Sequence, residues 1–154
     1  MTTNLKLTQT QELYQRDYYQ WLNTTAQLLR DRRYDDVNFD NLIEEIEAMG
    51  SSERRELENR LRVLLMHLLK YKYQPNRRSN SWLNTIDEQR NQLELLLEYS
   101  PSLKPFYFEV FDKCYLKARR SAAKETGLSI NTFPDLSPFT QEDTLDPDWL
   151  PQEE

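Results

Sequence analysis

Residues 57–82 read LENRLRVLLMHLLKYKYQPNRRSNSW and hold the densest run of apolar residues in the chain. Five residues of this stretch recur at steps of four, three, four and three: Leu57, Leu61, Leu64, Leu68 and Tyr71. That spacing is the period of one face of an α-helix. Further apolar residues surround the face, so the stretch predicts a central helix that neighbours contact on several sides. Pro75 ends this helix, because its ring disfavours the helical conformation at Gln74.

Four more helices are predicted, two before the central helix and two after it. The first runs from Thr8 or Thr10 to Arg33, the second starts at Asn38, and the others cover residues 82–99 and the stretch between Ser102 and Gly127. Gly50 is expected to end or bend the second helix. The apolar face of that helix is formed by Phe39, Leu42, Ile43, Ile46 and Met49. One charged residue, Arg90, interrupts the apolar stripe of the helix over 82–99.

Helical periodicity stops after Gly127. Residues 128–154 contain four prolines among scattered large apolar residues, which include Phe133, Phe139 and Trp149. A disordered acidic segment would carry fewer such residues. We therefore expect a single all-α domain, with a bundle of about five helices over residues 1–127 and an irregular acidic arm over 128–154 that packs on it.

The charge distribution argues against one class of function, binding to nucleic acid through a broadly basic surface. The net charge is −6, but residues 135–154 carry seven acids and no base, which leaves residues 1–134 at +1. This balance argues against a broadly basic nucleic-acid-binding protein. No apolar run has the length of a membrane span, and a single cysteine fits a reducing compartment. We expect a cytoplasmic protein without membrane contact.

Several motifs together resemble one known family. They are EEIEAMG at 44–50, HLLKYKYQP at 67–75 and SWLNTI at 81–86, within a resemblance that runs from about Leu13 to Pro151. The sequence resembles the bacterial domain-of-unknown-function family number twenty-nine, which is abundant in cyanobacteria. One departure is Val37-Asn38, where the family pattern is usually Leu-Asp. The resemblance implies an all-α fold and no reaction, cofactor or catalytic residue.

Glu44, Glu47 and His67 are the candidate catalytic residues. Carboxylates and a histidine on neighbouring helices of a bundle can bind a divalent metal, and all-α nucleotide pyrophosphohydrolases use clustered glutamates with magnesium. The spacing here does not match such a set, and helix geometry places Glu47 beside the apolar face and Glu44 towards solvent. A metal-dependent, nucleotide-hydrolase-like enzyme is therefore the alternative function, and we predict neither a metal nor a cofactor.

A basic and aromatic segment is the candidate interaction surface. It comprises Arg55, Arg62, Lys70, Tyr73, Arg77 and Arg78. Mixtures of basic and aromatic residues can bind single-stranded nucleic acid by phosphate contacts and stacking. Tyr73 is the one aromatic residue of the segment that the core does not require, so nucleic-acid binding is a second alternative. The sequence favours a protein-interaction or regulatory module, with another protein as partner or with self-association.

Overall fold

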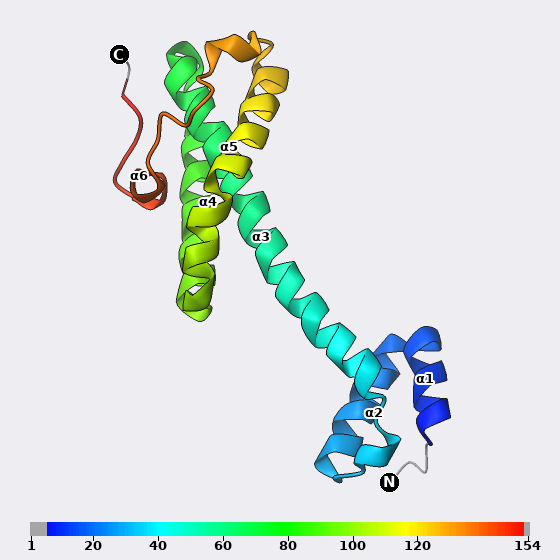
Figure 1. Ribbon diagram of the computed structural model, residues 1–154. Coiled ribbons are helices and arrows are strands. Elements are labelled where there is room, and N and C mark those ends of the chain that lie inside the picture. The colour runs from blue at the N-terminus through cyan, green and yellow to red at the C-terminus, as the bar shows by residue number, and fades with distance from the viewer. Residues whose placement is uncertain (1–5, 153–154) are drawn as a thin grey trace. The chain divides into compact units, whose positions relative to one another are not determined.

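The computed structural model describes residues 6–152, and in them the chain forms α-helices and short 3₁₀ turns without any strand (Figure 1). The predicted all-α fold is confirmed. The chain divides between Ser51 and Ser52 into two compact units. The first unit contains α1 (Leu7–Arg16), α2 (Tyr18–Arg30), the 3₁₀ turn η1 (Tyr34–Asp36) and the first part of α3 (Phe39–Tyr73). The second contains the rest of α3, η2 (Pro75–Arg77), α4 (Asn80–Tyr99), η3 (Pro101–Leu103), α5 (Lys104–Thr126), η4 (Ile130–Thr132) and α6 (Gln141–Leu145).

The first predicted helix is two helices, because Asp17 leaves the helical conformation. Its φ and ψ are −146° and 88°, and its side chain accepts a hydrogen bond from the backbone N–H of Gln20 at 3.1 Å. Asp17 therefore caps the N-terminus of α2, where a carboxylate satisfies a donor that lacks a helical partner. The resulting corner lets α1 and α2 bury the side chains of Leu13, Trp21 and Leu28.

Helix α3 does not end at Gly50, so the predicted second and central helices are one helix of 35 residues. Glycine inside a helix costs about 1 kcal/mol relative to alanine, which is too little to end a long helix. A Cβ atom added at Gly50 would meet nothing within 4 Å. The glycine therefore serves no close packing contact among the described residues.

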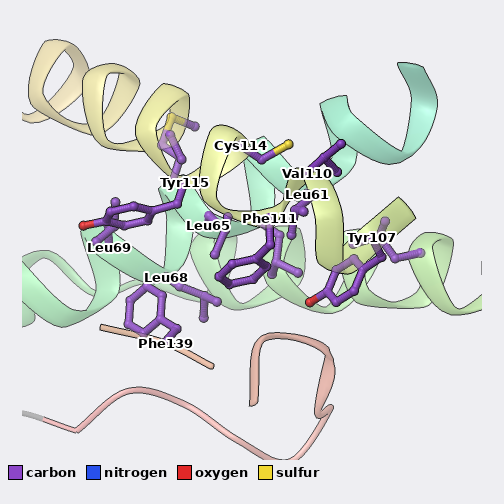
Figure 2. Close-up of a cluster of buried hydrophobic side chains, with 14 of the residues drawn as sticks. Leu61, Leu65, Leu68, Leu69, Tyr107, Val110, Phe111, Cys114, Tyr115 and Phe139 are labelled. Atoms are coloured by element: carbon purple, nitrogen blue, oxygen red, sulfur yellow. The ribbon is translucent and has the colours of Figure 1, made fainter. Parts of the chain in front are cut away.

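The core of the second unit forms between α3, α4 and α5 (Figure 2). The predicted face of the central helix is buried at Leu57, Leu61, Leu64 and Leu68. Ring and aliphatic side chains of α5 pack against it, including Phe111 and Tyr115. Gly127 closes α5 in the left-handed conformation, with φ 73°, which glycine adopts without steric cost.

The C-terminal arm, which is part of the second unit, packs on the helices of that unit through aromatic side chains and through its backbone. Phe133 and Phe139 are buried in the core cluster, and Figure 2 draws Phe139 close to Leu68. The hydroxyl group of Tyr115 donates to the carbonyl oxygen of Pro134 at 2.5 Å, and Arg119 Nε donates to that of Phe133 at 2.9 Å. The expected single domain, with a bundle over 1–127 and an arm over 128–154, stays a prediction.

Candidate functional site

Four large apolar side chains are exposed on one face of α3 in the first unit. The exposed fractions are 44% for Phe39, 52% for Ile43, 58% for Ile46 and 57% for Met49. The spacing of four, three and three residues places them on one side of the helix. We call these four residues the α3 face. The sequence predicted this side of the helix as apolar, and the other described residues of the first unit leave it uncovered.

A different side of α3 faces α1 and α2. Val37 and Asn38, which immediately precede α3, are buried. The hydroxyl of Thr10 in α1 donates to the backbone oxygen of Asp36 at 3.0 Å. The hydroxyl groups of Tyr14 and Tyr18 both donate to the carboxylate of Glu45. These contacts fix the orientation of α3 within the first unit and turn the α3 face to solvent.

Acidic residues border the α3 face. Residues 34–51 contain six acids and no Lys or Arg. On a helix with about 100° per residue, Asp40 and Glu47 lie about 120° and 100° to one side of Ile46, and Glu45 lies about 100° to the other. Asp40 and Glu47 are exposed, and neither forms an ion pair within residues 6–152. The first unit thus presents an apolar strip with an exposed acidic border on the side of Asp40 and Glu47, whereas Glu45 on the other side accepts hydrogen bonds from Tyr14 and Tyr18.

The candidate catalytic residues Glu44, Glu47 and His67 have ordinary surroundings. Glu44 and Glu47 are exposed in the first unit, whereas His67 lies half-buried in the second. Nδ1 of His67 is 2.9 Å from the backbone oxygen of Val63, and burial lowers the pKa of the imidazole. Within residues 6–152, no group of three His, Cys, Asp or Glu side chains is placed to hold a metal ion. A catalytic role for these three residues stays a prediction.

Glu45 is a polar centre that links α3 to α1 and α2, because it accepts hydrogen bonds from Tyr14 and Tyr18. The hydrogen bond to Glu45 is the main cause that raises the pKa of Tyr14 to about 12, and it also raises the pKa of Tyr18. The same two bonds lower the pKa of the Glu45 carboxyl. The two tyrosines stand four residues apart on either side of the corner at Asp17. That spacing was the one available signal, and it did not reveal the acceptor about 30 residues away.

Glu45→Gln is expected to change the alkaline titration of the tyrosines. A tyrosine whose pKa is raised from 10.0 to about 12 stabilises the fold fully below pH 10 and loses this contribution as the pH rises through 12. In Glu45→Gln the carboxylate is gone, so Tyr14 should ionise closer to pH 10. The difference in tyrosinate absorbance between the two proteins measures this shift. Glu47→Gln on the same helix is the control, and equal curves for wild type and Glu45→Gln would contradict the assignment.

The candidate basic surface is partly engaged in contacts of the second unit. Lys70 Nζ lies 3.3 Å from a carboxylate oxygen of Glu125 and 4.8 Å from the ring centre of Trp82. Tyr73 is not a spare aromatic residue, because its ring packs edge-on against Phe133 with 5.4 Å between the centroids.

Arg78 is also engaged in contacts within the second unit. Its guanidinium lies 4.0 Å from the ring centre of Tyr71, and its Nε donates to the Tyr71 backbone oxygen at 2.8 Å. Arg55 and Arg77 are exposed, and Arg62 is half-buried. The structure thus gives Lys70, Tyr73 and Arg78 a role in packing. Binding by this surface stays a prediction.

Arg90 holds the arm against α4. Its exposed fraction is 3%, its Nε donates to the backbone oxygen of Thr144 at 2.9 Å, and its Nη2 donates to that of Asp143 at 3.4 Å. These carbonyl groups lie near the C-terminal end of α6, where a cation is favoured. A pocket of about 440 Å³ lies beside it, lined in part by Leu97 and Leu145. An arginine inside an apolar stripe was the sequence signal for this contact.

No helix in the described part of the chain is both long and apolar enough to cross a membrane. No curated protein and no solved structure matches the chain significantly. The family model described as "Domain of unknown function DUF29" matches residues 13–150, nearly the whole length. The motifs at 44–50, 67–75 and 81–86 all lie inside the match. The chain therefore belongs to the DUF29 family, whose function is unknown.

Proposed function

We propose that the protein is a cytoplasmic protein-interaction module and that the α3 face is its binding surface. The observation that carries this proposal is the exposure of Phe39, Ile43, Ile46 and Met49 on one side of one helix. Contiguous exposed apolar patches on soluble proteins mark sites of interaction. The buried, unpaired Cys114 supports a reducing compartment.

The face has the properties of a surface that a partner covers. Full burial of an aliphatic or aromatic side chain stabilises a complex by about 1.5–3 kcal/mol relative to exposure. The hydrogen bonds of Tyr14 and Tyr18 to Glu45 hold α3 in place from another side, so the face is preformed. A preformed surface loses little conformational entropy on binding.

The double variant Ile43→Ser, Ile46→Ser tests the proposal. Tagged wild-type protein and variant are expressed in the native cell, co-purifying proteins are identified, and binding is measured again with the two purified proteins. We expect a defined partner that binds the wild type at least about tenfold more tightly than the variant, because the loss of two apolar contacts removes more than 1.4 kcal/mol.

Leu116→Ser is the matched control, since Leu116 is 54% exposed on α5 in the second unit. It should retain the partner. Equal affinity of the wild type and the Ile43→Ser, Ile46→Ser variant for every purified partner would refute the α3 face as the binding surface.

A further inference from the structure

We infer that the partner presents a basic amphipathic helix to the α3 face. This inference rests on the proposed function and adds the chemistry of the partner. Its basis is the charge around the face: Asp40 and Glu47 are exposed at one border, and residues 34–51 contain no Lys or Arg. A partner with Lys and Arg beside its own apolar residues complements both the strip and its acidic border.

The dimensions of the face fit a helix. From Phe39 to Met49 the helix rises about 15 Å, at about 1.5 Å per residue, which is about three turns. A partner helix that lies along it needs apolar residues at positions i, i+3, i+4 and i+7 to contact the strip. Lys or Arg residues that flank this stripe then reach the carboxylates of Asp40 and Glu47. A partner segment of about 14–18 residues is long enough for these contacts.

A second copy of the chain is a poorer occupant of the same face. In a two-fold symmetric dimer, one surface meets its own copy. The two strips would then face each other, and neither strip would bring a basic residue to balance Asp40 and Glu47 of the other copy. Like charges across an interface are unfavourable. Residues 135–154, with seven acids and no base, carry the same sign of charge.

Three labelled synthetic peptides test the partner chemistry by fluorescence anisotropy with the full chain. The first has a leucine stripe flanked by lysines, the second has the same stripe flanked by glutamates, and the third has the composition of the first in scrambled order. We expect the lysine peptide to bind at least about tenfold more tightly than either of the others at low salt. Raising the salt concentration should reduce this difference, because ions screen exposed charges.

Charge reversal at the border provides the decisive variant. Asp40→Lys, Glu47→Lys is expected to reverse the preference, so that the glutamate peptide binds more tightly than the lysine peptide. Lysine in the first turn of α3 is unfavourable for the helix dipole, so a thermal melt followed by circular dichroism accompanies the binding curves. The control is Glu109→Lys, Asp112→Lys, two exposed acids on α5, which should bind the peptides as the wild type does.

The outcomes separate the inference from the proposed function. Equal binding of the lysine and glutamate peptides, absence of binding by all three, or an unchanged preference in Asp40→Lys, Glu47→Lys would overturn the basic helix. A dimer in sedimentation velocity that Ile46→Ser dissociates would also overturn it in favour of a second copy. The proposed function is judged independently, by whether a purified partner depends on Ile43 and Ile46.

Discussion

Leu64→Asp is expected to abolish the cooperative unfolding transition of the second unit. Leu64 lies at the centre of the predicted face of α3 and has an exposed fraction of 0%. A carboxylate there would be buried among apolar side chains without a partner, and such changes cost more than about 4 kcal/mol. Circular dichroism during heating should show a broad, weak transition in place of a sharp one.

Leu116→Asp is the matched control for this substitution, because Leu116 is 54% exposed on α5. Its melting temperature should lie within a few degrees of the wild-type value, as is usual for a surface substitution of about 0.5 kcal/mol. A sharp transition for Leu64→Asp near the wild-type temperature would show that the central helix does not bury this face.

Phe133→Ala is expected to release the arm. The Phe133 side chain is 1% exposed and packs edge-on against Tyr73, and truncation of a buried phenylalanine costs about 3–5 kcal/mol. Limited proteolysis measures the effect: cleavage between residues 128 and 150 should be slow in the wild type and fast in the variant.

The control is Leu136→Ala, three residues further along the same arm. Leu136 is 81% exposed, so its truncation should leave the proteolysis rate unchanged. If the wild-type arm were trimmed as rapidly as that of Phe133→Ala, the arm would not be held by its aromatic side chains in solution.

The sequence predicted the structure best where one helix buries a whole face. Leu57, Leu61, Leu64 and Leu68 are all buried, because their spacing alone defines a face that a core must cover. Local signals at helix ends were less reliable. Asp17 was a usable N-cap signal for a new helix, while Gly50 was a weak signal that the hydrogen bonds of a long helix override.

Periodicity also identified the apolar side of the helix that contains Ile43 and Ile46, but it did not tell what covers that side. Which side of α3 is covered depends on where α1 and α2 pack. The packing of α1 and α2 is set by contacts such as those of Tyr14 and Tyr18 with Glu45. These are contacts between residues far apart in the sequence, and a single sequence does not reveal them. The same holds for Tyr73, whose ring partner lies 60 positions further along the chain.

The docking of the arm has a consequence for synthesis on the ribosome. The chain emerges from its N-terminus, and domains fold as soon as the residues that complete their cores are available. All buried residues among those described in the first unit precede Phe39, so its core is complete early in translation. The second unit needs Phe133 and Phe139 to close its core around Leu68, and their contacts span a long stretch of chain. Until those residues leave the exit tunnel, the nascent α3, α4 and α5 present an open apolar surface that is a target for chaperones.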